Sequence, residues 1–161
     1  MWPVIAICVG ASAGALARWG LGLWLSPGGV IPWGTLAANL IGASAGALAR
    51  WQLGVWLNAA AAAGTTLPLG TLAANLIGGY LVGLCVAVFQ ANPHLDPVWR
   101  LALVTGFLGA LTTFSSFSAE VVHLLLHARY ALALGTAAIH LLGSLALTAA
   151  GIWTVRTVLS I

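Results

Sequence analysis

The sequence predicts an all-α integral membrane protein, and three observations carry this prediction. Hydrophobic residues make up 61% of the 161 residues, charged residues make up 4%, and the mean hydropathy is +1.08. A soluble domain could not carry this composition on its surface. The apolar residues also fall into five stretches, each near the roughly 20 residues that a bilayer-spanning helix needs. The predicted spans are residues 2–25, 34–57, 67–90, 98–126 and 130–157.

Helix-breaking residues separate these stretches in order along the chain. SPGGVIP at 26–32 follows the first span, and NAAAAAGTTLP at 58–68 follows the second. ANPHLDP at 91–97 follows the third, and a short turn around residues 128–129 precedes the last. Pro, Gly and Asn interrupt helices, so these segments are the predicted connections between spans.

The fourth stretch is too long for one straight span and carries hydroxyl groups at its middle. Gly106 and Gly109 are followed by four hydroxyl residues, which are Thr112, Thr113, Ser115 and Ser116. In hydrocarbon, every polar group needs an internal partner or a water-filled cavity. We therefore expect this helix to break near residues 106–113, with two half-helices that meet at mid-membrane and line a pore.

The N-terminal half contains a direct repeat. GASAGALARW occurs at 10–19 and again at 42–51, and GTLAANLIG occurs at 34–42 and again at 70–78. A partial duplication explains the pattern, because the copies are too few and too unevenly spaced for a solenoid. We predict that residues 34–161 form a four-helix core and that residues 1–33 add an extra N-terminal transmembrane helix. The alternative is that residues 2–25 fill the first-helix position and displace the second stretch.

The repeated GASAG satisfies the G-x-S-x-G pattern of a hydrolase nucleophile, but that pattern needs a preceding strand and a catalytic acid and histidine. Here it lies within apolar helices, so the sequence predicts no enzyme. Glycines four residues apart instead favour close helix packing. The expected packing pairs are Gly10 with Gly14, Gly42 with Gly46, and Gly79 with Gly83.

The five arginines are scattered along the chain, which argues against nucleic-acid binding. In a four-helix core, Arg50 and Arg129 lie near one membrane face and Arg100 and Arg156 near the other. The positive-inside rule needs an excess on one side to set the orientation. Insertion in both orientations is therefore expected, which would allow an antiparallel homodimer in the lipid bilayer.

Glu120, His123 and His127 share one helical face, and Glu-x-x-His is half of a di-iron signature. A di-iron bundle needs a second such motif and two more glutamates, whereas the only other acid is Asp96. An ionisable residue within a span is also a candidate for function. Glu120 thus supports an alternative function, a proton-coupled small-solute membrane transporter.

The remaining polar groups carry no net charge. Asn39 and Asn75 each follow GTLAA, Phe114 and Phe117 share a face, and a polar stripe of His140, Ser144 and Thr148 runs along the last helix. Amides, hydroxyls and a neutral histidine donate hydrogen bonds, and the edge of a phenyl ring is electropositive. These groups suit a small anion that must be bound and then released.

Three blocks resemble the signature sequences of the CrcB/Fluc fluoride-specific ion channel family. They are GTLAANLIGGYLVG at 70–83, VTGFLGALTTFSSFSAE at 104–120 and LLGSLALTA at 141–149. The resemblance covers residues 42–161 in order. It implies a dual-topology homodimer of four-helix subunits in the cell inner membrane, with a broken third core helix. It also implies passive export of fluoride from the cytoplasm and a central structural Na⁺ that is not transported.

The resemblance also assigns residues to these roles. The Na⁺ carbonyls fall on Gly109 and Thr112, and Ala110 stands where a glycine is common in the family. The vestibule arginine falls on Arg50, with Arg18 as the other copy, and the pore asparagine falls on Asn75, with Asn39 as the other copy. The complete predicted pore set is Asn75, Phe114, Phe117, Ser115, Thr113, Thr71, His140, Ser144 and Arg50, with Thr136 and Glu120 as further matching positions.

Overall fold

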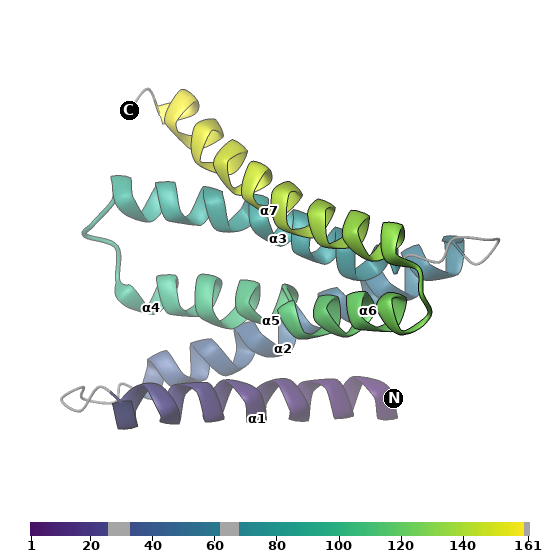
Figure 1. Ribbon diagram of the computed structural model, residues 1–161. Coiled ribbons are helices and arrows are strands. Elements are labelled where there is room, and N and C mark those ends of the chain that lie inside the picture. The colour runs from purple at the N-terminus through teal and green to yellow at the C-terminus, as the bar shows by residue number, and fades with distance from the viewer. Residues whose placement is uncertain (26–32, 62–67, 160–161) are drawn as a thin grey trace. The chain divides into compact units, whose positions relative to one another are not determined.

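The computed structural model describes all residues except 26–32, 62–67 and 160–161, and every regular element in the described part is helical (Figure 1). The predicted connection at 26–32 and most of the one at 58–68 lie outside the described residues. The helices begin and end close to the predicted spans. Their bounds are α1 Trp2–Leu25, α2 Trp33–Ala61, α3 Leu69–Ala91, α4 Pro97–Arg100, the π-helix η1 Leu101–Leu108, α5 Gly109–Leu111, α6 Phe114–Leu126 and α7 Tyr130–Leu159.

Four helical segments of the described chain are long and apolar enough to cross a membrane, which makes this a multi-pass membrane protein. They are Trp2–Gly22, Leu69–Ala91, Pro97–Leu126 and Tyr130–Leu159. The predicted span at 34–57 does form a helix, α2, of 29 residues, but it is not among these four. Polar residues within this helix lower its mean hydropathy, and they are Asn39, Arg50, Gln52 and Asn58.

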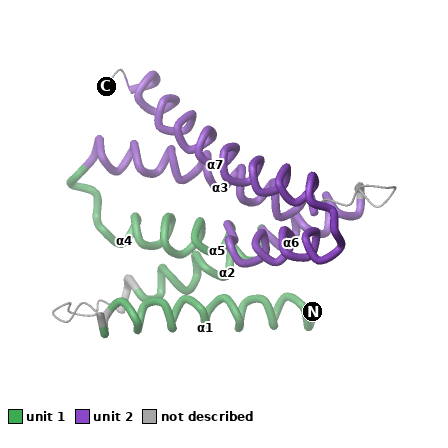
Figure 2. The backbone as a smooth tube through the Cα atoms, in the orientation of Figure 1, with its two compact units in different colours: residues 1–49, 93–111 green, residues 50–92, 112–161 purple. Residues whose placement is uncertain are grey.

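The chain divides into two compact units, which Figure 2 shows in different colours. Unit 1 comprises residues 1–49 and 93–111, and unit 2 comprises residues 50–92 and 112–161. In unit 1, α2 packs against η1 through two glycines. A Cβ atom on Gly42 would lie 2.5 Å from the carbonyl oxygen of Ala102, and one on Gly46 would overlap the carbonyl of Phe107. Both positions therefore need glycine for close backbone approach.

In unit 2, α3 and α7 make the most extensive contact between elements, with α6 packed on α7. Gly83 and Gly151 bring the two backbones together, because a Cβ on either would overlap a carbonyl oxygen of the facing helix. Thr148 adds a polar contact, since its hydroxyl lies 3.0 Å from the carbonyl oxygen of Gly79. The Tyr80 hydroxyl similarly donates to Thr154 Oγ1 at 3.2 Å. This glycine-lined packing is the kind that membrane helices favour.

The predicted glycine packing holds for two of the three pairs. Gly42 and Gly46 contact η1, and Gly79 and Gly83 contact α7. The prediction for Gly10 and Gly14 is wrong, because a Cβ on either would meet no atom of the described residues within 4 Å. The glycines of the same decapeptide are therefore packed against η1 in the second copy and lie open in the first.

The segment from residue 97 to 126 changes its helical geometry several times. Asp96 caps its start, accepting a hydrogen bond from the Val98 amide at 2.9 Å. The π-helix Leu101–Leu108 and the short α5 follow, and α5 ends at Leu111. Residues 112–113 are not helical, and α6 begins at Phe114. That two half-helices meet here at mid-membrane stays a prediction.

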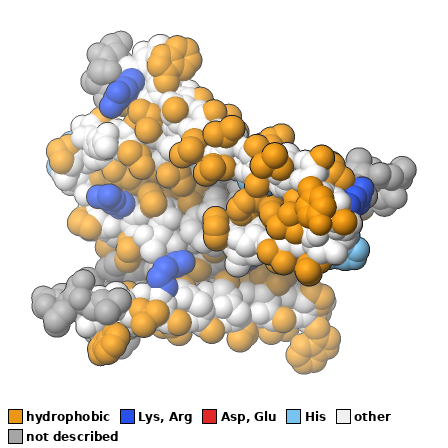
Figure 3. Space-filling model, viewed as in Figure 1, with side chains coloured by type: hydrophobic (Ala, Val, Ile, Leu, Met, Phe, Trp, Pro, Cys, Tyr) orange, Lys and Arg blue, Asp and Glu red, His pale blue; other side chains and the backbone are white. Residues whose placement is uncertain are grey.

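Apolar side chains lie on the outside of the helices, with arginines as isolated patches (Figure 3). Leu141, Leu142 and Leu145 of α7 are each more than half exposed, and so are Trp2 and Trp153. Exposed apolar surface of this extent is stable only when lipid or another protein covers it. The outer surface thus fits the membrane class indicated by the composition.

Candidate functional site

The candidate site forms in unit 2, where the chain leaves the helix between α5 and α6. Thr113 has an extended backbone, with φ −149° and ψ 116°, and is 8% exposed. Its hydroxyl caps α6 by accepting a hydrogen bond from the Ser116 amide at 3.1 Å. The Ser115 and Ser116 hydroxyls lie 3.2 and 3.1 Å from the same oxygen. Three of the four predicted hydroxyls thus stabilise the start of this helix.

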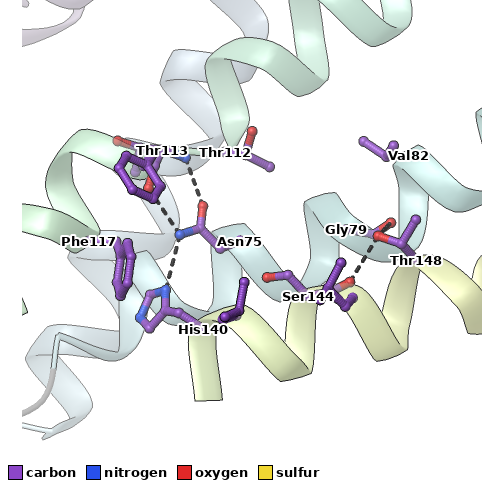
Figure 4. A pocket seen from close by; sticks show the side chains of 12 residues that line it. Asn75, Gly79, Val82, Thr112, Thr113, Phe117, His140, Ser144 and Thr148 are labelled. Carbon is purple, nitrogen blue, oxygen red and sulfur yellow. Dashed lines mark hydrogen bonds between the residues drawn. The ribbon is translucent and has the colours of Figure 1, made fainter. Parts of the chain in front are cut away.

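Asn75 of α3 holds both backbone groups of Thr113. Its Oδ1 accepts a hydrogen bond from the Thr113 amide at 2.7 Å, and its Nδ2 donates to the Thr113 carbonyl at 3.1 Å (Figure 4). A residue outside a helix has no helical partner for these groups, and leaving them unpaired in a membrane is costly. An N–H can only donate and a carbonyl can only accept, so this contact also fixes the orientation of the Asn75 amide.

The orientation of Asn75 in turn sets the proton position on His140. Asn75 Nδ2 lies 3.1 Å from His140 Nδ1, and Nδ2 can only donate. His140 Nδ1 is therefore the acceptor, and the neutral ring carries its hydrogen on Nε2. His140 is 5% exposed, although it lies on an apolar helix. His140 of α7 is therefore an uncharged hydrogen-bond donor through Nε2.

Two phenylalanines complete the cluster. The Phe117 ring stacks on His140 with ring centroids 4.8 Å apart and 25° between the planes. Phe114 meets Phe117 edge to face at 5.5 Å and 66°, and Phe114 itself is 79% exposed. Since both rings start α6, the cap at Thr113 positions them. We call Asn75, Thr113, Phe117 and His140 the Asn75 cluster.

A cavity of about 330 Å³ opens beside the Asn75 cluster, and α3, α6, α7 and residues 112–113 supply its wall (Figure 4). The residues that line it include no Asp, Glu, Lys or Arg. A second cavity of about 270 Å³, next to Pro68 and Leu72, shares a single lining residue with the first, His140. The first cavity is lined by Asn75, Gly79, Val82, Thr112, Thr113, Phe114, Phe117, His140, Leu141, Ser144, Leu145 and Thr148.

The structure brings together most of the predicted pore residues but not all. Thr71 lies outside the first cavity, where its hydroxyl donates to Glu120 Oε1 at 2.6 Å. The second carboxylate oxygen, Oε2, is buried and has no hydrogen-bond partner among the described residues. Thr136 lines the second cavity, and its buried hydroxyl also has no partner in the described part of the chain. Thr71, Glu120 and Thr136 thus lie outside the Asn75 cluster, and of the three only Thr136 lines one of these two cavities.

The two copies of the repeat have different surroundings. Arg50 belongs to unit 2, and its Nη1 lies 3.5 Å from the Thr112 carbonyl oxygen. Arg18 belongs to unit 1, where it donates to the Thr105 carbonyl at 2.8 Å. Asn39 is also in unit 1, is 2% exposed, and lines a cavity of about 230 Å³ with Arg18. Only the later asparagine copy, Asn75, therefore contacts Thr113 and His140.

Sequence reasoning missed two features of the site. It placed Thr148 in the polar stripe but did not assign it to the site, although Thr148 lines the cavity. It also expected Asn75 to offer its amide hydrogens to an ion, whereas both are directed at Thr113 and His140. No local signal links Asn75 to Thr113, because the two residues are 38 positions apart.

Fold and site together define a multi-pass helical membrane protein with a cavity at a non-helical backbone segment, lined by apolar and uncharged polar residues. Comparison with known proteins identifies the family. The model of the CrcB-like protein family (Camphor Resistance, CrcB) matches residues 40–152. The chain belongs to this family, which confirms the resemblance seen in the sequence blocks.

Several relatives match along nearly the whole chain. A protein of Albidiferax ferrireducens named fluoride-specific ion channel FluC is 68% identical over 154 residues, covering 96% of this chain and 91% of the relative. Proteins of the same name from Variovorax paradoxus and Pseudomonas putida are 52% and 56% identical, each over 154 residues. The first covers 96% of this chain and 94% of the relative, and the second covers 94% and 91%. These names describe ion channels rather than enzymes, in agreement with the prediction of no enzyme.

Proposed function

We propose that this protein is a fluoride-selective passive ion channel. The names of its relatives support fluoride as the transported ion. The Asn75 cluster supports passive conduction as the mode of transport. The observation that carries the proposal is the cavity beside this cluster, which is lined by hydroxyl residues, Phe114, Phe117 and His140 and by no Asp, Glu, Lys or Arg. Uncharged donors replace part of the hydration shell of an anion without trapping it, as conduction requires.

In this proposal the side chains have distinct roles. Asn75 positions the Thr113 backbone and the His140 ring rather than meeting the ion with its own amide hydrogens. His140 Nε2–H is a donor at the one residue shared by the two cavities, and Ser144 and Thr148 bring hydroxyls to the wall of the first. The electropositive edges of Phe114 and Phe117 complete the surroundings of the anion.

Fluoride efflux from liposomes tests the proposal. Purified protein is reconstituted into vesicles loaded with potassium fluoride, and a fluoride electrode records release after valinomycin is added. A passive channel releases fluoride only when valinomycin balances the charge, and a pH gradient leaves the rate unchanged. Phe114→Ile and Asn75→Asp are expected to abolish release. In Asn75→Asp the carboxylate offers no hydrogen to the Thr113 carbonyl, which thereby loses its donor.

The same assay distinguishes the alternative function, proton-coupled transport through Glu120. The observation that favours this alternative is Glu120 Oε2, which is buried and has no hydrogen-bond partner among the residues that the structure describes. A coupled transporter would release fluoride in response to a pH gradient without valinomycin, and Glu120→Gln would abolish that release. Release of this kind would contradict the channel proposal. No release under either condition would contradict both functions.

We further propose an antiparallel homodimer in the inner membrane that exports fluoride from the cytoplasm. The balanced arginines support insertion in both orientations. Phe114 is 79% exposed in the single chain although it lines the cavity, so a second subunit is expected to cover it. Cysteine accessibility at both ends of α7 in intact cells tests the topology. A single orientation would contradict the antiparallel arrangement.

We propose the structural Na⁺ at Gly109 and Thr112 as a feature of the dimer, held by carbonyl groups from both subunits. Backbone carbonyls are suitable ligands for a hard cation. However, the Arg50 guanidinium lies 3.5 Å from the Thr112 carbonyl, and Arg18 Nη1 lies 3.5 Å from the Cβ position of Gly109. Each candidate residue therefore has a cationic side chain as a neighbour. Na⁺ stays a prediction about the dimer, and no step of the proposed function depends on it.

A further inference from the structure

We propose that the exposed end of α6 binds one divalent transition-metal ion through His123 and His127. The proposal is independent of the fluoride pathway, because neither histidine lines the first or second cavity. It rests on the geometry of the two rings and on a hydrogen bond that prepares one of them as a ligand.

The two histidines lie one helical turn apart on the same face. Residues i and i+4 are neighbours on a helix surface, and here the ring centroids are 4.2 Å apart with 41° between the planes. Both side chains are exposed. Two imidazoles at this spacing can place one nitrogen each on the same ion, at the Zn–N distance of about 2.0–2.1 Å typical of proteins.

A backbone hydrogen bond sets the tautomer of His127. Its Nδ1 lies 2.8 Å from the carbonyl oxygen of His123. A carbonyl can only accept, so Nδ1 carries the hydrogen and Nε2 keeps its lone pair. Histidines that ligate metals usually donate their other ring N–H to a carbonyl or a carboxylate in this way. His127 is therefore already oriented as an Nε2 ligand.

The surroundings limit the site to two protein ligands. Within the described residues, no group of three or more His, Cys, Asp or Glu side chains could hold a metal. Glu120 lines a cavity of about 300 Å³ with His123, but its Oε1 accepts from Thr71 and its Oε2 is buried. Water molecules would complete the coordination sphere. Imidazole ligands favour Cu²⁺, Ni²⁺ and Zn²⁺, with Cu²⁺ the tightest, over Mg²⁺ and Ca²⁺.

Copper titration followed by electron paramagnetic resonance tests the site. The full-length protein is purified in detergent, its affinity tag is removed, and Cu²⁺ is the probe. Its spectrum counts nitrogen ligands and distinguishes them from the thiolates of Cys8 and Cys85. One bound Cu²⁺ with two imidazole nitrogens is expected. His123→Ala and His127→Ala should each weaken binding by about tenfold or more.

His94→Ala is the matched control, because His94 is also exposed but lies in the loop before α4. It should leave the affinity and the two-nitrogen spectrum unchanged. The exposed positions of His123 and His127 should keep both variants folded, which circular dichroism and gel filtration check. Unchanged affinity in His123→Ala, or a spectrum with a single nitrogen ligand in the wild type, would overturn the proposal.

Discussion

At the scale of single residues, Asn75 connects the non-helical backbone at Thr113 to the ring of His140. Its amide satisfies the N–H and C=O groups of Thr113 and directs one hydrogen at His140. An ion that took a hydrogen of Asn75 Nδ2 would deprive the Thr113 carbonyl or the His140 ring of its donor. The asparagine is therefore best understood as the residue that positions the cluster.

The repeat offers a matched test of this role. Asn75→Ala is expected to destabilise the protein by about 1–3 kcal/mol for each Thr113 group left unpaired. Asn39→Ala should cost less, because Asn39 Oδ1 has no hydrogen-bond partner in the described structure. Thermal unfolding of both variants in the same detergent measures the difference. Equal destabilisation would argue against the positioning role.

The tautomer of His140 can be measured directly. We expect nitrogen NMR of the protein labelled with ¹⁵N-histidine to show a protonated Nε2 and an unprotonated Nδ1, because Asn75 Nδ2 donates to Nδ1. Asn75→Ala removes that donor and should allow the other tautomer. A hydrogen on Nδ1 in the wild type would contradict the network.

At the scale of elements, glycine positions decide how closely the helices pack. The contact between α3 and α7 depends on Gly79, Gly83 and Gly151, and a Cβ on Gly83 would overlap the Thr148 carbonyl. The first copy of the repeat shows the opposite case, since Gly10 and Gly14 meet nothing. The effect of a methyl group should therefore depend on position rather than on local sequence.

Gly83→Ala and Gly10→Ala test this difference. Gly83→Ala is expected to lower stability by about 1–3 kcal/mol, the usual cost of overpacking. Gly10→Ala should be neutral or raise stability by up to about 1 kcal/mol, because alanine favours the helix. Fluorescence-detected gel filtration after heating compares the two variants. If Gly10→Ala lowered stability more than Gly83→Ala, the close contact at Gly83 would not be what holds α3 and α7 together.

At the scale of the whole molecule, the sequence predicted the membrane class and the helix bounds well. Composition and apolar run length are local properties, and they placed all five helical regions to within a few residues. The contact between Asn75 and Thr113 could not be predicted, because it joins residues 38 positions apart. The repeat shows the same limit, since GASAGALARW is identical at 10–19 and 42–51 but its two glycines are packed in only one copy.

Deletion of residues 1–33 tests the predicted division into an extra helix and a core. The family model matches only residues 40–152, and the Asn75 cluster lies wholly in unit 2. The shortened protein is therefore expected to insert into membranes and to release fluoride from liposomes at a rate close to that of the full chain. Loss of release in a protein that still inserts would favour residues 2–25 as the first-helix position.

The hydrogen bond from Asn75 to His140 bears on whether protons can cross the site together with an ion. A ring whose second nitrogen already faces a donor cannot accept another hydrogen there without losing that contact. A proton that moved through His140 Nδ1 would therefore have to break the hydrogen bond with Asn75. If fluoride passes this point as a bare anion, its passage consumes no protons from the gradient that drives ATP synthesis.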